Sequence, residues 1–126
     1  DTKNGEPHTL PLSEYLFDLL NKRNVANIDQ CPWVFPSPLN DGPLKDPRTA
    51  VARVAGLSNV PFTLHDLRRT FITIAESLDI PAYALKRLLN HKDSNDVTAG
   101  YIVSSVDRLR EPMQRISSFI LESIDA

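Results

Sequence analysis

The chain has 126 residues, a length typical of one domain with a modest core, and its 41% hydrophobic and 24% charged residues are typical of a globular protein. No apolar run approaches the roughly 20 residues that span a membrane, and the first residues do not resemble a signal peptide. For these reasons we expect no membrane partner. The single cysteine, Cys31, excludes an internal disulfide, so we expect a cytoplasmic protein.

The first twelve residues, DTKNGEPHTLPL, predict a small β-hairpin. Asn4-Gly5 is a strong two-residue turn signal, and residues 8–10 have the composition of a short strand. Only three residues precede the turn, so we expect the sequence to start inside a hairpin and to be part of a longer chain.

A first helix is expected from Ser13, which can cap it, to about Asn21. Its apolar side chains should face inward: Leu16, Leu19 and Leu20. A second helix should start at Asp46-Pro47 and end at Gly56.

The connection between these two helices, residues 29–46, contains four prolines and predicts irregular structure. We expect Trp33 and Phe35 to anchor this connection in the core and Cys31 to be buried or half-buried.

The segment LHDLRRTFITIAESL, residues 64–78, predicts an amphipathic helix. Thr63 can cap the start of this helix, with Asp66 as the acidic partner of a capping box. His65 and Arg68 share a face beside the apolar stripe, because residues three apart are neighbours on a helix surface. The stripe itself should rest on a core: Leu64, Leu67, Phe71, Ala75 and Leu78.

The last third of the chain predicts two more helices. Pro81 should start a helix that ends at about Leu89, and residues 90–101 should form a loop or short helix. Residues 105–124 carry an apolar stripe of helical period, which Pro112 should kink or split.

Charge is unevenly distributed along the chain, whose formal net charge is −2. Residues 45–92 hold eight Lys and Arg against four Asp and Glu, whereas the remainder holds six against twelve. A basic middle favours phosphate binding, although a solvated face of mixed charge is an alternative explanation.

Four residues stand in an order typical of one enzyme family: His65, Arg68, His91 and Tyr101. The segments HDLRRT and LLNHKDSNDVTAGYI resemble the two catalytic boxes of the tyrosine recombinases, the phage integrase family, and most closely those of prophage and genomic-island integrases. The resemblance covers nearly the whole chain. It implies a mainly α fold with a small N-terminal hairpin: the C-terminal part of an integrase catalytic domain spanning residues 1–126.

The resemblance also implies a catalytic lysine in the hairpin, which falls on Lys3, and a second arginine in a Gly-x-Arg-x-x-Glu segment that is absent from these 126 residues. For this reason we expect the chain alone not to cleave DNA. Asn90 stands where relatives commonly have glycine, and it tolerates the left-handed backbone expected at a helix end.

The implied chemistry is cleavage and rejoining of a DNA strand without a cofactor. Tyr101 would attack the phosphate and become covalently linked to it, with His65 as its general base. Arg68 would hold the non-bridging oxygens and His91 would donate a hydrogen bond to them. Lys3 would protonate the leaving 5′ oxygen. The sequence has no Asp, Glu and His cluster with the spacing of a two-metal nuclease, so we expect no metal site.

The partners implied are double-stranded DNA attachment sites and further copies of the protein, four in the recombining complex. Four more basic residues are candidates for contacts with flanking phosphates, a solvated helix face being the equal alternative: Arg69, Lys86, Arg87 and Lys92.

Two other functions remain open at this stage. The same residues would serve a type IB topoisomerase-like enzyme, and a non-catalytic DNA-binding or oligomerisation module could keep them without assembling a site. For the last helix we expect docking on a neighbouring copy through Met113, Ile116 and Ile120, with docking on its own domain as the alternative.

Overall fold

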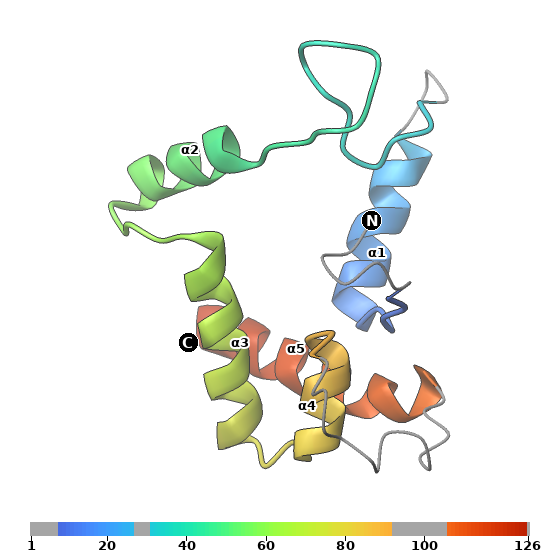
Figure 1. Ribbon diagram of the computed structural model, residues 1–126, viewed down its shortest axis with the longest axis vertical. Helices are drawn as coiled ribbons and strands as arrows, with labels where there is room; N and C mark the ends of the chain where they lie inside the picture. The colour runs from blue at the N-terminus through green and yellow to red at the C-terminus, as the bar shows by residue number, and fades with distance from the viewer. Residues whose placement is uncertain (1–7, 27–30, 92–105, 126) are drawn as a thin grey trace. The chain divides into compact units, whose positions relative to one another are not determined.

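The computed structural model describes residues 8–26, 31–91 and 106–125, and in these ranges the chain is mainly helical, as predicted (Figure 1). It divides into two compact units, residues 16–70 and residues 1–15 with 71–126. The elements follow in this order: α1 (Glu14–Val25), α2 (Arg48–Ser58), α3 (Leu64–Ser77), α4 (Ala82–Leu88), the 3₁₀ helix η2 (Val106–Leu109) and α5 (Arg110–Asp125). None of the described helices is long and apolar enough to cross a membrane.

The unit that contains residues 71–126 has a dense apolar core. Ala75 of α3 and Ala84 of α4 are completely buried, and Ile116 of α5 is 1% exposed in the same cluster. Partly buried side chains surround them, including Phe71 and Met113. Because alanine adds little bulk, it leaves room for the larger Ile116 side chain to fill the space in this cluster.

The helices α3 and α4 end in the same way. Asp79 and Asn90 follow the two helices with positive φ values of 52° each, in the left-handed region. At the end of α3 the Ile80 amide donates to the Ala75 carbonyl at 2.9 Å. This is the Schellman pattern of helix termination, which satisfies carbonyls that have no partner within the helix. The left-handed conformation predicted for Asn90 is confirmed.

The C-terminal stripe is divided between two helices, but Pro112 does not kink the longer one in its middle. The 3₁₀ helix η2 changes to α5 between Leu109 and Arg110, two residues before Pro112. Pro112 therefore lies in the first turn of α5, where a missing backbone N–H breaks no intrahelical hydrogen bond.

The N-terminal segment departs from the prediction. Residues 8–10 form no strand, and no neighbouring strand lies among the described residues with which they could pair. The predicted turn at Asn4-Gly5 falls in residues 1–7, outside the described residues. At the end of this segment the Glu14 amide donates a hydrogen bond of 2.9 Å to Gln114 Oε1 of α5.

The unit of residues 16–70 buries its side chains less than predicted. Leu16 and Leu19 of α1 are exposed, so the inward face predicted for this helix is wrong for these two residues. Helix α2 continues through Gly56 to Ser58 and ends at Asn59, whose φ is 55°. Gly56 is tolerated within the helix at a cost of about 1 kcal/mol relative to alanine.

In its described part, residues 31–46, the proline-rich connection is irregular, as predicted, and contains an isolated bridge between Pro36 and Pro43. Trp33 and Phe35 do not anchor a core, because 43% and 57% of their surfaces are exposed. The Arg23 guanidinium instead lies 5.1 Å from the centre of the Phe35 ring, a cation–π distance. Cys31 is half-buried, as predicted.

Only the second half of the apolar stripe of α3 packs in the core. Phe71, Ala75 and Leu78 belong to the core, whereas Leu64 and Leu67 are about half exposed. The change falls where the helix passes from one compact unit to the other, between Thr70 and Phe71.

The expected docking of the last helix on a neighbouring copy is wrong for two of its three residues. Ile116 and Met113 pack in the core of their own unit, and the Arg115 guanidinium donates to the Leu78 carbonyl. Ile120 keeps 38% of its surface exposed. The buried apolar side chains of α5 pack within the chain, in the cluster to which α3 and α4 contribute small buried side chains.

Replacing Ile116 by alanine should lower the free energy of unfolding by about 2–5 kcal/mol, because a buried side chain is lost and a cavity remains. Ile124 on the same helix is 72% exposed, so Ile124→Ala should change it by less than about 0.5 kcal/mol. Urea unfolding of the two variants measures both values. Equal values for both would show that α5 does not pack as described.

Candidate functional site

Helix α3 presents His65 and Arg68 in its first two turns, and both residues are exposed. The start of the helix is held by a reciprocal capping box. The Thr63 amide donates to Asp66 Oδ2 at 2.9 Å, and the Asp66 amide donates to Thr63 Oγ1 at 3.3 Å. This confirms the predicted cap, and it fixes the backbone from which His65 projects.

Hydrogen bonds from the Thr63 hydroxyl and amide hold the pKa of the Asp66 carboxyl below its usual value. The charges of Arg69 and His65 act in the same direction. Arg69 Nη1 lies 3.7 Å from Asp66 Oδ1, and its side chain is 71% exposed. The carboxylate therefore stays ionised and belongs to the helix cap.

His91 stands directly after α4, at the end of its terminating turn. Its amide donates to the Lys86 carbonyl at 2.9 Å, and the Asn90 amide donates to the Arg87 carbonyl at 3.1 Å. The residue is exposed. Its backbone position follows from the left-handed conformation of Asn90, which turns the chain out of the helix.

Three of the five predicted catalytic residues lie in the described parts of the chain, and two do not. His65 and Arg68 belong to the unit of residues 16–70, and His91 belongs to the other unit. The structure places His65 and Arg68 relative to each other, and it places His91 relative to the residues of its own unit. Lys3 and Tyr101 lie outside the described residues, as does Lys92 among the predicted phosphate contacts.

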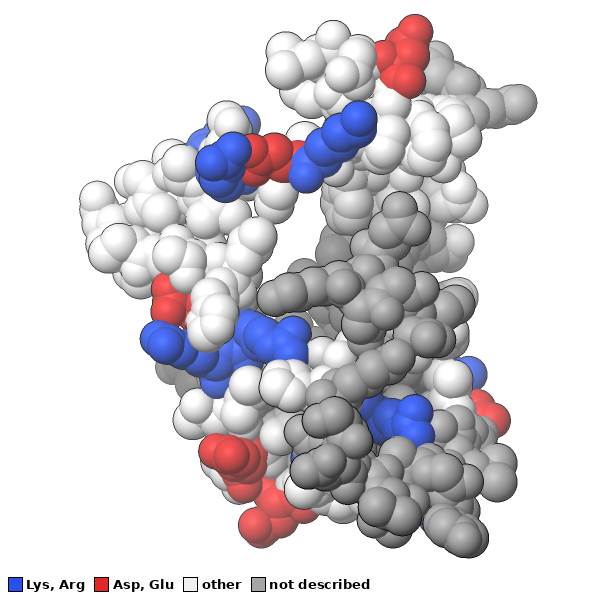
Figure 2. All heavy atoms as spheres, in the orientation of Figure 1, with Lys and Arg blue, Asp and Glu red and all other residues white. Residues whose placement is uncertain are grey.

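The remaining predicted DNA contacts are exposed basic residues. Arg69 lies on α3, and Lys86 and Arg87 form the basic last turn of α4. Figure 2 shows basic side chains gathered over the first half of α3, and the residues that supply charge there are Arg68 and Arg69. Guanidinium groups on an accessible helix face can meet phosphate oxygens through paired hydrogen bonds.

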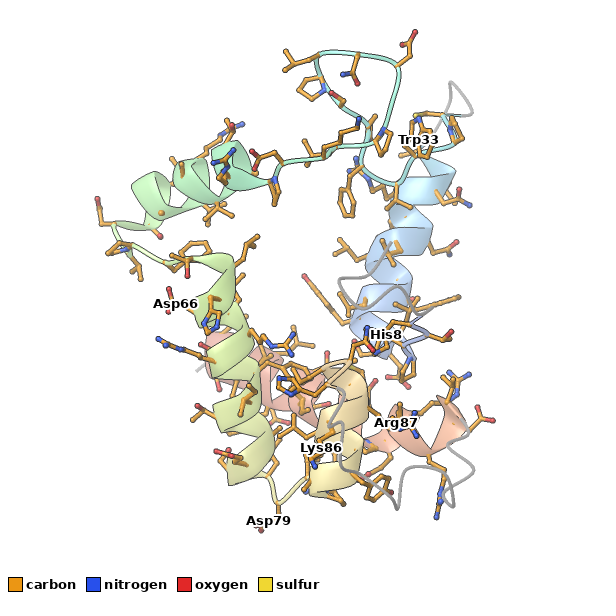
Figure 3. All side chains as sticks on the ribbon, in the orientation of Figure 1. His8, Trp33, Asp66, Asp79, Lys86 and Arg87 are labelled. Carbon is orange, nitrogen blue, oxygen red and sulfur yellow. The ribbon has the colours of Figure 1, made fainter. Side chains whose placement is uncertain are left out.

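His8 also lies beside the turn that ends α4, a position that was not predicted from the sequence. Its Nε2 atom lies 2.8 Å from the Arg87 carbonyl, at the end of the helix that precedes His91 (Figure 3). No local pattern could have indicated this contact, because the two residues are 79 positions apart. Among the residues that the structure describes, no group of three or more His, Cys, Asp and Glu is placed to hold a metal ion.

Comparison with characterised proteins finds one informative relative. The chain is 32% identical over 116 residues to a protein described as Prophage integrase IntF of Escherichia coli (strain K12). The match covers 89% of this chain and 25% of the relative, so the chain spans a quarter of the relative's length. No family model and no solved structure matches the chain.

The fold and the order of the candidate residues agree with this similarity. The chain is mainly helical, with a histidine and an arginine three residues apart on one helix and a histidine after the next helix. This similarity to a prophage integrase supports a relationship between the chain and the phage integrases, the tyrosine recombinases.

The pKa of Asp66 tests the helix cap. In the 126-residue chain, a carbon-13 NMR titration of the carboxyl should give a pKa below the ordinary 3.8, and Thr63→Ala should raise it toward that value. Asp46 serves as the control because Arg48, rather than Thr63, lowers its pKa. An ordinary Asp66 pKa in the unaltered chain would contradict the capping geometry.

The sign of the stability effect follows from the same shift. A carboxyl whose pKa is lower in the folded state stabilises it fully above the ordinary pKa of 3.8. This contribution is lost as the pH falls from there through the folded-state pKa. The difference in unfolding free energy between the natural chain and Asp66→Asn should therefore shrink on acidification below pH 3.8.

Proposed function

We propose that this chain is the C-terminal part of an integrase catalytic domain that recombines DNA at specific sites, for the integration or excision of a mobile element. The observation that carries the proposal is the relationship to a prophage integrase over 89% of the chain, together with the order of His65, Arg68, His91 and Tyr101. The position of His65 and Arg68 on a capped, accessible helix supports it.

In the proposed reaction Tyr101 attacks the phosphorus of the scissile phosphodiester. The new bond joins the tyrosine oxygen to phosphorus, and the bond from phosphorus to the 5′ oxygen breaks. His65 takes the phenolic proton and Lys3 supplies a proton to the leaving oxygen. Since the phosphotyrosyl bond conserves the energy of the broken bond, a 5′ hydroxyl of a partner strand can reverse the step without ATP.

Arg68 and His91 would stabilise the charge that develops on the non-bridging oxygens. A guanidinium offers two parallel N–H groups to a phosphate, and an arginine on a helix behind a capped first turn presents that fork from a defined backbone. The resemblance implies a second arginine, which these 126 residues lack in the expected segment. We therefore propose that the chain by itself forms no covalent adduct.

The proposed partners are duplex attachment sites and further copies of the protein, four in the recombining complex. Arg69, Lys86, Arg87 and Lys92 would contact flanking phosphates, so binding should weaken steeply as salt is raised. Because the substrate is DNA, we propose that the protein acts in the bacterial cytoplasm, at the nucleoid.

Replacing Tyr101 by phenylalanine should abolish covalent attachment to DNA and leave DNA affinity within a few-fold, because only the attacking oxygen is lost. The test uses a protein that contains this chain and the upstream residues implied by the resemblance, with a nicked attachment-site duplex and denaturing electrophoresis. Tyr83→Phe is the matched control, because Tyr83 lies on α4 and is exposed.

The same assay separates the alternatives. Adducts that persist in Tyr101→Phe would overturn the choice of nucleophile. DNA binding without any adduct in the unaltered protein would indicate a non-catalytic binding module. Cleavage and religation of one strand, without exchange between two duplexes, would indicate a topoisomerase-like enzyme.

Replacing Arg68 by alanine should slow adduct formation by about 10²–10³, the loss expected for one transition-state donor. Arg68→Lys should restore little of this rate, because a point charge cannot make the paired contact. Arg69→Ala is the neighbouring control and should mainly weaken binding. A lysine variant with nearly natural cleavage would show that Arg68 supplies only charge.

A further inference from the structure

The turn that carries His91 receives a contact from a distant part of the chain. His8 is half-buried, and its ring Nε2 lies 2.8 Å from the Arg87 carbonyl. A carbonyl oxygen only accepts hydrogen bonds, so Nε2 must carry the proton and donate it. The contact joins residues of one compact unit, since that unit includes both residues 1–15 and 71–126.

The acceptor is part of the motif that ends α4. The Arg87 carbonyl also accepts the Asn90 amide at 3.1 Å, while the Lys86 carbonyl accepts the His91 amide at 2.9 Å. A carbonyl oxygen can accept more than one hydrogen bond, and this one accepts the His8 ring in addition to backbone amides of the turn. The side chain of His8 thereby adds an external donor to the carbonyl around which the chain turns toward His91.

The comparison with α3 shows that this contact is an addition to the motif. The turn at Asp79 has the same pair of backbone hydrogen bonds, from Asp79 to Glu76 at 3.0 Å and from Ile80 to Ala75 at 2.9 Å. There the residue after the left-handed position, Ile80, is 6% exposed and lies in the core. His91, in the equivalent place after α4, is exposed, so no comparable burial among the described residues holds it.

We propose that His8 is a positioning residue for His91: its ring N–H holds the Arg87 carbonyl and so keeps the turn from Leu88 to His91 closed. The proposal rests on the proposed function for the role of His91 in the reaction, but the positioning itself is a property of the chain. The hydrogen bond of His8 stabilises the turn at the end of α4, whereas burial of Ile80 stabilises the turn at the end of α3.

Amide hydrogen exchange in the 126-residue chain tests the positioning. His8→Ala should speed exchange at Asn90 and His91 by about five-fold, the effect of one net hydrogen bond, and leave Asp79 and Ile80 unchanged. His8→Gln, which keeps an N–H donor, should return both rates to within about two-fold of natural values. Thr9→Ala, a change at an exposed neighbour, should leave all four unchanged.

Unchanged exchange at Asn90 and His91 in His8→Ala would overturn the proposal. So would equal acceleration at both helix ends that His8→Gln does not reverse. Should His8→Ala not fold, nitrogen-15 spectra of the natural chain decide the question. Neutral His8 must carry its proton on Nε2, and a proton on Nδ1 would overturn the contact.

A second measurement links the contact to the reaction. In an adduct-forming protein that contains this chain, His8→Ala should slow adduct formation about five-fold at saturating DNA without weakening binding, and His8→Gln should restore the rate. Faster exchange with an unchanged rate would overturn the positioning role in catalysis. Absence of adducts in the unaltered protein would count against the proposed function, and the exchange result would still decide the positioning.

Discussion

The packing of Ile116 against Ala75 and Ala84 is the constraint on which this unit of the structure depends. All three side chains are buried to within 1% of their surface, and they come from the three helices α5, α3 and α4. Close packing of this kind tolerates little change in volume, because neither a cavity nor an extra methylene is accommodated cheaply. The helix ends that leave this core are therefore defined in position, and the turn after α4 leads directly to His91.

The candidate residues are positioned through backbone hydrogen bonds at helix ends. A capping box between Thr63 and Asp66 defines the start of α3, and so the direction of His65. A left-handed residue, Asn90, defines the path of the chain into His91. Such an arrangement holds the candidate side chains on an accessible surface, where apolar packing cannot hold them, since exposed side chains have few neighbours.

Sequence patterns predicted those features that depend on neighbours along the chain. The capping box and the core half of the α3 stripe follow from spacings of three or four residues, and they are confirmed. The left-handed conformation of Asn90, expected from the residue type at a helix end, is confirmed as well. Contacts between residues distant in sequence could not be predicted. The His8 hydrogen bond joins residues 79 positions apart. The apolar stripe of α5, taken as a sequence pattern, fits a neighbouring copy as well as its own unit. That residues 1–126 form a single domain, and that Lys3 and Tyr101 complete the site, stay predictions.

Asp66 and the two arginines that follow it, Arg68 and Arg69, define the charge at the start of α3 in a chain whose net charge is −2. The hydrogen bonds with Thr63 hold the Asp66 carboxylate in the helix cap, so its negative charge lies at the first turn of α3. The ion pair between Asp66 and Arg69, at 3.7 Å and largely in solvent, is worth little. Because this ion pair is weak and exposed, replacing Asp66 by another anion as the partner of Arg69 costs little free energy. Asp66 therefore stabilises the start of the helix through Thr63 while it holds the Arg69 guanidinium only weakly, and the Arg69 side chain stays largely exposed.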